Sequence, residues 1–465
     1  MVGSSSDKGE NQQLTGRGAR DHKPAAWTRR EALRGFSAAA LAAVAGPVAA
    51  ETQPDWMKQI FGSSTEASRA PTDAAPKKLD QLNDLRPNTV PYRSDEMVEA
   101  IEAALTRYQT IAANGGWPKI PGEKMIRPED EDERVPLLRR RLQVTGELRA
   151  SGGSNYGYDG ALEAAVKQFQ LDHGLRVSGR VDRATLAALN VPVQGRVEQL
   201  KLNLGRIREL MTTRVEDRYV LVNAAAFQLE AVERQEVQQR HRIIAGRAGR
   251  ETPVVKATVR ALNFFPLWHV PDSVATLDLI PKMQKDPDYI TKEKIRVFDR
   301  AYNGPELDPS KVDWTTATAT QIKFRQDAGP QDALGLMRID MPNSEGVYMH
   351  DTPMKPLFQQ RSRAFSAGCV RVQDVFKLGE WIARNEAGWG QPGRAEAVIE
   401  AGQPLDLTLT RPIPVYFTYI TAWAEPGGTI QFRPDVYGRD GAPMLAAGRD
   451  RDENEPAPPT QSLAP

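Results

Sequence analysis

The chain has 465 residues, which is enough for two or three domains. Its 61 lysines and arginines balance 60 aspartates and glutamates, and a formal charge of +1 argues against a general nucleic-acid-binding protein, which normally has a clear basic excess. A single cysteine, Cys369, excludes an intramolecular disulfide and a four-cysteine zinc site, and five scattered histidines form no metal motif. We therefore expect neither a metal nor a cofactor, and Cys369 is either inert or a working thiol.

The first 50 residues have the order of a cleavable export signal. Arg29 and Arg30 precede a weakly apolar, alanine-rich run over residues 35–48, which ends in small residues suited to cleavage. Paired arginines before such a run are typical of the twin-arginine route, which exports folded proteins. The run is too short for a stable membrane span. The pattern predicts a signal peptide over residues 1–50 and a periplasmic protein; the alternative is a disordered tail leading into an alanine-rich helix.

Two amphipathic patterns predict a helical scaffold over residues 94–215. Residues 51–93 lack periodicity and predict a linker. Residues 94–113 then carry apolar side chains at helical spacing with Ser94 as the N-cap, and residues 197–211 repeat this pattern. We expect the two helices to pair, with a separate module inserted between them.

Residues 134–192 predict that module as three short helices. The first covers residues 137–143, and the others begin after the N-caps Asp159 and Asp182, with His173 as a capping or turn residue. The module contains five characteristic stretches: Tyr158-Asp159-Gly160, residues 165–170, His173-Gly174-Leu175, residues 179–182 and Thr185-Leu186. These residues resemble the peptidoglycan-binding module of cell-wall enzymes. The resemblance implies a wall polymer as partner, and a protein-docking unit is the alternative.

After residue 218 the pattern changes to strands. We expect them at residues 219–222, 227–232, 237–244, 254–262, 335–340, 346–350, 405–409, 415–422 and 429–432. They predict an α+β multidomain protein in which residues 216–440 form a mixed β sandwich or partly open barrel. An insertion at about 272–326, with helical stretches at 279–285 and 291–297, predicts a lid over a site. Residues 441–465 predict a disordered tail.

Catalytic chemistry centres on Cys369. A free thiol is mostly protonated at neutral pH and needs a nearby base or positive potential. His350 is the candidate base, and on a strand it shares a face with Tyr348. Arg371 and the N-terminus of the helix that follows add positive potential. The small residues before the cysteine end in Gly368, which predicts that Cys369 lies at an accessible turn.

The residues around Cys369 resemble a known family. The strings are His350-Asp351-Thr352-Pro353 and Ser366-Ala367-Gly368-Cys369-Val370-Arg371-Val372. They are similar to the signature of the L,D-transpeptidases, in particular the large Gram-negative type with a peptidoglycan-binding module and a lid insertion. Further similar stretches are Trp268-His269-Val270-Pro271, residues 329–335 and Asp435-Val436-Tyr437, so the resemblance spans about residues 94–440. One departure is Ala367, where many smaller members have a second histidine.

The resemblance implies acyl transfer on peptidoglycan stem peptides. Cys369 would attack a tetrapeptide donor and His350 would act as general acid and base, so that D-alanine leaves and a thioester remains. An amine acceptor then gives a 3→3 crosslink. The backbone N–H of Cys369, next to Gly368, and the Tyr348 hydroxyl would hold the oxyanion. Ser366 and Arg371 are candidates to orient the donor or the loop, although Arg371 could instead be a solvated surface arginine. Asp351 is not assigned a catalytic role.

Several alternatives remain at this point. The same chemistry with water gives an L,D-carboxypeptidase, and with a protein amine it attaches protein to the wall. A noncatalytic wall-binding scaffold would typically have lost Cys369 or His350, and both are present. A papain-like cysteine peptidase would have its histidine far downstream of the cysteine. The expected partners are peptidoglycan stems and glycan, together with other wall-synthesis enzymes, and the resemblance implies that carbapenems acylate Cys369.

Overall fold

The computed structural model describes residues 84–86, 88–149 and 156–441, which belong to one compact unit spanning residues 70–465. The predicted signal peptide, most of the predicted linker and all but the first residue of the predicted tail lie outside the described residues. Across the part of the chain that is described, no helix combines the length and apolar character needed to cross a membrane.

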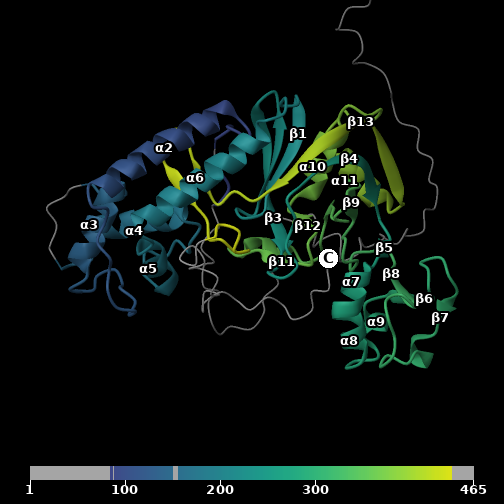
Figure 1. Cartoon of the computed structure of the whole chain (residues 1–465). Helices are drawn as coiled ribbons and strands as arrows, with labels where there is room; N and C mark the ends of the chain where they lie inside the picture. The colour runs from purple at the N-terminus through teal and green to yellow at the C-terminus, as the bar shows by residue number, and fades with distance from the viewer. Residues whose placement is uncertain (1–83, 87, 150–155, 442–465) are drawn as a thin grey trace, which may run out of the picture. The chain divides into compact units, whose positions relative to one another are not determined.

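Two long helices form the scaffold. α2 (Asp95–Ala113) and α6 (Val193–Leu210) lie side by side in Figure 1 and bury apolar faces that include Met97, Ile101 and Leu200. The Ser94 hydroxyl accepts a hydrogen bond from the Met97 N–H at 3.2 Å, so Ser94 is the N-cap of α2. The same core continues into the C-terminal hairpin of β14 (Ala422–Ala424) and β15 (Ile430–Phe432), which therefore packs on the scaffold.

A three-helix module lies between the scaffold helices in the sequence. α3 (Val135–Thr145), α4 (Gly160–Asp172) and α5 (Arg183–Leu189) surround a core that includes Leu138, Val166 and Phe169. Asp159 and Asp182 accept hydrogen bonds from backbone N–H groups of the first turns of α4 and α5. These short acceptors satisfy otherwise free donors, which is why the helices begin there.

Nine strands form one mixed sheet that closes on itself. Their bounds are β1 (Arg218–Asn223), β2 (Gln228–Glu233), β3 (Glu236–Gly246), β4 (Val255–Phe264), β9 (Met337–Asp340), β10 (Met349–His350), β11 (Ala364–Ser366), β12 (Val370–Val372) and β13 (Leu405–Thr418). Their order is β11-β3-β12-β10-β9-β4-β13-β1-β2, and a further pairing of β2 with β3 closes the ring. The catalytic-domain fold is therefore barrel-like, with β11 added parallel to β3.

Some strand predictions differ from the structure. The predicted strands at 405–409 and 415–422 are one strand, β13, whose register shifts between Thr408 and Ile413 in its pairing with β4. This irregularity hides the continuity because it interrupts the alternation of side chains. The predicted strand at 346–350 is reduced to Met349–His350, since the chain turns at Gly346 with φ +65°. The helices α10 (Val375–Ala383) and α11 (Arg394–Ala401) follow β12.

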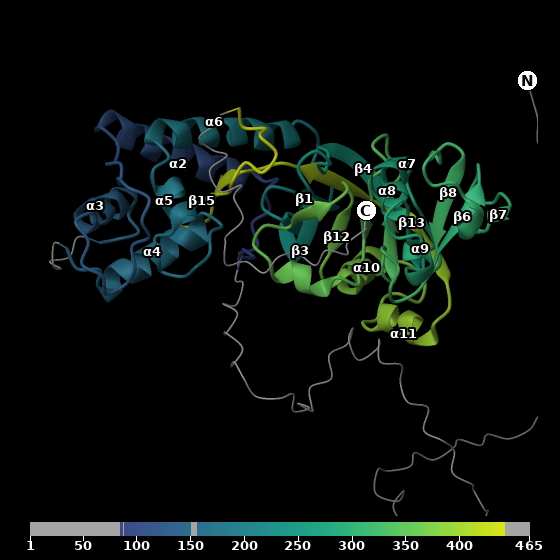
Figure 2. The ribbon, with the colours of Figure 1, turned by 90° about the horizontal axis from the view of Figure 1, so that it is seen from below.

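The insertion is a small α/β unit rather than a helical one. It contains α7 (Asp272–Val274), the π-helical turn η1 (Ala275–Leu279), α8 (Ile280–Met283) and α9 (Tyr289–Lys292). They are accompanied by a sheet of four strands in the order β5 (Trp268–His269), β8 (Ile322–Gln326), β6 (Ile295–Asp299) and β7 (Glu306–Leu307). Figure 2 shows β8, β6 and β7 beside α8 and α9. The predicted helix at 291–297 is wrong because Lys294 adopts φ +54°, which ends the helical turn before β6.

The end of the predicted linker is part of the fold. Tyr92 and Arg93 are completely buried and Arg86 is 6% exposed. This segment, residues 84–86 and 88–93, is called the N-terminal strap below. It lacks apolar periodicity because ion pairs and backbone contacts, rather than an amphipathic face, hold it in place.

Candidate active site

Cys369 lies in a tight loop between two strands that share a neighbour. β11 pairs parallel with β3, and β12 pairs antiparallel with β3, so both ends of the loop rest on the same strand. The Ser366 hydroxyl donates to the Cys369 carbonyl at 2.6 Å and accepts from the Gly368 N–H at 3.1 Å. Gly368 has φ +126°, a conformation that side-chain-bearing residues rarely adopt. Ser366 and Gly368 therefore shape the backbone that presents the thiol.

A threonine that the sequence did not single out supports this loop from the outside. The Thr252 hydroxyl donates to the Gly368 carbonyl at 2.9 Å and accepts from the Gly246 N–H at 2.9 Å. The Tyr437 hydroxyl donates to the Gly246 carbonyl at 2.7 Å. Thr252 lies 116 residues before Gly368, so no local spacing could have revealed it. Tyr437 lies in one of the stretches on which the family resemblance rests.

The strands next to the cysteine carry His350 and Arg371, and Tyr348 directly precedes one of these strands. β10 pairs parallel with β12, which places His350 opposite Arg371, and the Val370 N–H donates to the Tyr348 carbonyl at 3.0 Å. The rings of Tyr348 and His350 meet edge to face with centroids 5.7 Å apart. His350 is completely buried. The structure thus brings the predicted site residues together, although Tyr348 precedes the strand instead of belonging to it.

The thiol is buried and its pKa is raised. Only 5% of Cys369 is exposed, so the predicted accessible turn is wrong. Burial raises the pKa of the thiol to about 11, although hydrogen bonds from Tyr348 and the positive charges of Arg371 and Arg338 act in the opposite direction. Positive potential is therefore present as predicted, but desolvation outweighs it. At neutral pH the resting cysteine is a neutral thiol.

Arg371 is an interior residue. Its side chain is completely buried, which excludes the solvated surface arginine considered from the sequence. Burial lowers the pKa of the guanidinium to about 10, and the neighbouring Cys369 raises it in part. Arg371 is therefore a buried charge close enough to Cys369 to influence its pKa.

The insertion covers the cysteine loop. Its apolar core includes Trp268, Leu279 and Phe324, and the half-buried Tyr348 and Ala367 pack against it. Asp278 on η1 forms ion pairs with Arg247 at 3.2 Å and with Arg250, and Arg250 also donates to the Ser273 carbonyl at 2.9 Å. These contacts fasten the insertion to the β3–β4 loop. The insertion therefore packs against residues next to Cys369, and its role as a lid stays a prediction.

Asp351 has a structural partner on each oxygen. Oδ2 accepts the Leu336 N–H at 3.0 Å, and Oδ1 pairs with Lys355. A Cβ at Gly335 would lie 2.4 Å from Oδ2, so only glycine fits beside the carboxylate. Asp351 therefore holds the turn that precedes β9. This agrees with leaving it out of the catalytic set.

Asp332 is a second buried acid near this turn. It is 1% exposed, and its Oδ1 accepts the Leu334 N–H at 2.9 Å. Burial, together with Asp351 and Asp327, raises the pKa of its carboxyl to about 8. Within the described ranges, no group of three or more histidine, cysteine, aspartate or glutamate side chains is arranged to hold a metal ion.

Two family models match the chain. Residues 217–399 match the "L,D-transpeptidase catalytic domain", and residues 131–189 match the "Putative peptidoglycan binding domain". A curated relative from Haemophilus influenzae, named "Putative L,D-transpeptidase", is 34% identical over 222 residues. That match covers 48% of this chain and 44% of the relative, so the chain spans less than half of the relative's length.

Solved structures of L,D-transpeptidases also match the chain. An L,D-transpeptidase from Stackebrandtia nassauensis is 13% identical, with 63% of this chain and 97% of that chain covered and a TM-score of 0.24. An L,D-transpeptidase from Mycobacterium smegmatis is 11% identical, with 43% and 58% covered and a TM-score of 0.21. We base the assignment on the family models and the curated relative, since these scores are low. The chain therefore contains a segment similar to the L,D-transpeptidase catalytic domain over residues 217–399, and before it a segment similar to a peptidoglycan-binding domain over residues 131–189.

Proposed function

We propose that the protein is a periplasmic cysteine L,D-transpeptidase that forms 3→3 peptidoglycan crosslinks through a thioester on Cys369. The observation that carries the proposal is the loop from Ser366 to Cys369, seated beside Tyr348 and His350 in a domain that matches the L,D-transpeptidase catalytic domain. Export by the twin-arginine route and cleavage of residues 1–50 belong to the same proposal, because peptidoglycan lies outside the cytoplasm.

The raised pKa of the thiol defines what the base must do. Because Cys369 rests as a neutral thiol, its proton has to be removed as the substrate is attacked. His350 is the residue we assign to this step. The Cys369 sulfur bonds to the carbonyl carbon of the third residue of a donor tetrapeptide, and the proton passes through His350 to the departing D-alanine amine. The C–N bond to D-alanine breaks, and a thioester remains.

Hydrogen-bond donors near the thiol suit the developing oxyanion. We assign the Cys369 backbone N–H and the Tyr348 hydroxyl to this role, since donors fixed in a water-poor site stabilise such a charge strongly. Ser366 and Gly368 hold the loop rather than the donor, because they bond within the loop. Arg371 is completely buried, and we assign it to the positive potential near the thiol. The acceptor amine of a second stem then resolves the thioester.

The module over residues 131–189, which matches a peptidoglycan-binding domain, supports binding of the protein to the cell wall. Glycan or stem peptides are the partners it would engage, and this would raise the concentration of donor stems near the lid. Other wall-synthesis enzymes would supply the tetrapeptides.

The test uses the purified full chain without its signal peptide. It is incubated with muropeptides that contain tetrapeptide stems, and products are identified by mass. Release of D-alanine with appearance of dimers supports transpeptidation, whereas release without dimers identifies an L,D-carboxypeptidase. Transfer to an added protein amine would indicate wall attachment. A chain that binds muropeptides but releases no D-alanine is a noncatalytic scaffold, and crosslinking that survives Cys369→Ala refutes the thioester.

A further inference from the structure

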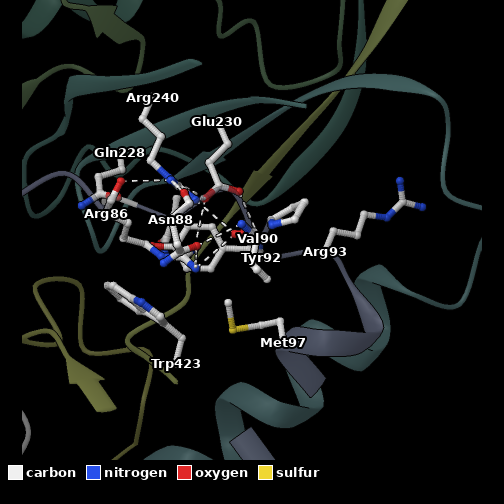
Figure 3. A network of polar contacts seen from close by, with 12 residues as sticks. Arg86, Asn88, Val90, Tyr92, Arg93, Met97, Gln228, Glu230, Arg240 and Trp423 are labelled. Atoms are coloured by element: carbon white, nitrogen blue, oxygen red, sulfur yellow. Dashed lines mark hydrogen bonds and ion pairs between the residues drawn. The ribbon is translucent and has the colours of Figure 1, made fainter. Parts of the chain in front are cut away.

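The N-terminal strap is anchored deep in the catalytic domain. Figure 3 shows Arg86 and Arg240 converging on Glu230, with Arg86 to Glu230 at 3.1 Å and Arg240 to Glu230 at 3.0 Å. Glu230 is completely buried and also accepts the Tyr92 N–H at 3.0 Å. Arg86 pairs in addition with Glu425 at 2.7 Å. The strap is therefore fixed to β2, β3 and the segment after β14 at once.

Asp84 is the first residue of the strap, and it pairs with two arginines. Its two carboxylate oxygens divide between two arginines: Oδ1 pairs with Arg242 at 2.7 Å and Oδ2 with Arg363 at 2.6 Å. Burial alone would raise the pKa of Asp84, but the charges and hydrogen bonds of the two guanidinium groups outweigh it and hold the pKa below its usual value. Asp84 is thus charged at neutral pH. It lies 279 residues from Arg363 in the sequence.

Arg363 connects Asp84 to the segment before the cysteine. It is completely buried, and it donates to the carbonyls of Ile243 at 3.1 Å and Gln360 at 2.7 Å. The next residue begins β11, whose last residue, Ser366, holds the Cys369 carbonyl. Every link from the carboxylate of Asp84 to the nucleophile loop is therefore a hydrogen bond, an ion pair or a covalent step of the chain.

Arg242 connects Asp84 to the segment after the cysteine. Arg242 lies on β3, and its backbone carbonyl accepts the Gln373 N–H at 2.9 Å. Gln373 directly follows β12. One carboxylate thus contacts arginines that support both sides of the turn containing Cys369. The other ion pairs of the strap join Arg86 to Glu230 and Glu425 and join Arg93 to Glu216, so Asp84 is the one acid that the strap contributes.

We propose that Asp84 is a positioning residue for the nucleophile loop. By neutralising Arg363 and Arg242 it fixes the start of β11 relative to β3 and β12, and so fixes the position of the Cys369 sulfur. Without the carboxylate, Arg363 and Arg242 lose the acid with which both pair. We expect β11 to shift as a result, and a displacement of about 1 Å at a reacting atom can cost about 10²-fold in rate.

The experiment compares Asp84→Asn, the conservative Asp84→Glu and the matched control Glu425→Gln. Glu425 anchors the same strap through Arg86 and Asn88, and it also accepts a hydrogen bond from the Trp423 indole N–H. Two readouts are used on the full chain without its signal peptide. One is D-alanine release from a disaccharide-tetrapeptide, which rests on the proposed function. The other is the rate of Cys369 alkylation by iodoacetamide, which does not.

For D-alanine release we expect Asp84→Asn to lower kcat by about 10- to 10²-fold with little change in KM, since binding groups stay in place. Asp84→Glu restores part of the rate, and Glu425→Gln leaves it close to the parent. For alkylation, Asp84→Asn is faster than the parent because the loop loosens and the thiol is less buried, and Glu425→Gln is not.

Equal effects of Asp84→Asn and Glu425→Gln on both readouts would overturn the proposal, because Asp84 would then act only by attaching the strap. If Asp84→Asn does not fold, the double variant Asp84→Asn with Arg363→Gln removes the buried charge together with its partner. Parent-like kcat and alkylation in that folded double variant would also overturn it. A parent chain that releases no D-alanine refutes the proposed function, while the alkylation arm still tests Asp84.

Discussion

The burial of Cys369 makes a quantitative prediction about its reactivity. Burial raises its pKa from 9.0 to about 11. At pH 7 the thiolate fraction is then about 10⁻⁴, whereas a thiol with the unshifted pKa would be about 10⁻² ionised. Because the thiolate is the nucleophile, we expect iodoacetamide to alkylate the resting protein at least about 10²-fold more slowly than the unfolded chain.

The assay is unambiguous because the chain contains one cysteine. Alkylation rates are measured by intact mass between pH 6 and pH 10, and the same chain in urea is the matched control. The folded protein should gain about tenfold in rate for each pH unit up to at least pH 9, without a plateau. The unfolded chain should level off near the ordinary thiol pKa.

A different profile would refute this reasoning. A plateau at or below pH 8 in the folded protein, or a rate at pH 7 equal to that of the unfolded chain, would mean that a thiolate paired with the imidazolium of His350 already exists at rest. His350 would then have removed the proton before the substrate binds, and burial would not set the pKa of the Cys369 thiol.

The remaining predictions concern the lid, the loop and the buried acid. Asp278→Asn removes two partly exposed ion pairs worth about 0.2–1 kcal/mol each, so alkylation of Cys369 should rise about two- to thirtyfold if the insertion controls access to the thiol. Asp272→Asn breaks the Asp272–Lys323 pair within the insertion and should not change the alkylation rate. Gly368→Ala forces a side chain into φ +126° at a cost of about 1–3 kcal/mol and should slow acylation by a carbapenem, whereas Gly402→Ala, at φ +64° in open space, should not. Burial raises the pKa of Asp332 to about 8 from an ordinary value of 3.8. Between these two pH values the carboxyl is ionised in the unfolded chain but protonated in the folded one, so the free energy of unfolding falls as the pH rises. Asp332→Asn should therefore raise the thermal midpoint more at pH 8 than at pH 5, and an unchanged pH dependence would contradict this assignment.

Local chemistry made part of the fold predictable. Ser94, Asp159 and Asp182 are N-caps because a short acceptor side chain satisfies backbone donors within the same turn, so the sequence pattern contains the whole interaction. The longer strands of the barrel were predicted from β-branched or alternating residues, whereas the three-residue strands β11 and β12 on either side of Cys369 were not predicted. Closure of the sheet into a ring was not predictable, because the pairing of β13 with β1 and of β12 with β3 joins segments far apart in the sequence.

The residues of the candidate site could be predicted from the sequence, but their burial could not. The motif segments supplied Cys369, His350 and Tyr348, and the structure brings them together. Burial of Cys369 was missed because the covering side chains belong to an insertion far away in the sequence. Thr252 and Asp84 were missed for the same reason, since their partners are 116 and 279 residues distant.

The place of β13 in the ring limits when the catalytic domain can fold. β13 lies between β4 and β1, so the ring stays open until residues 405–418 have been synthesised. Its pairing with β1 joins Val415 to Val220, a contact of long sequence separation that forms slowly. A chain truncated before residue 405 would therefore leave the sheet open, with unpaired edges at β4 and β1 that invite pairing with other chains.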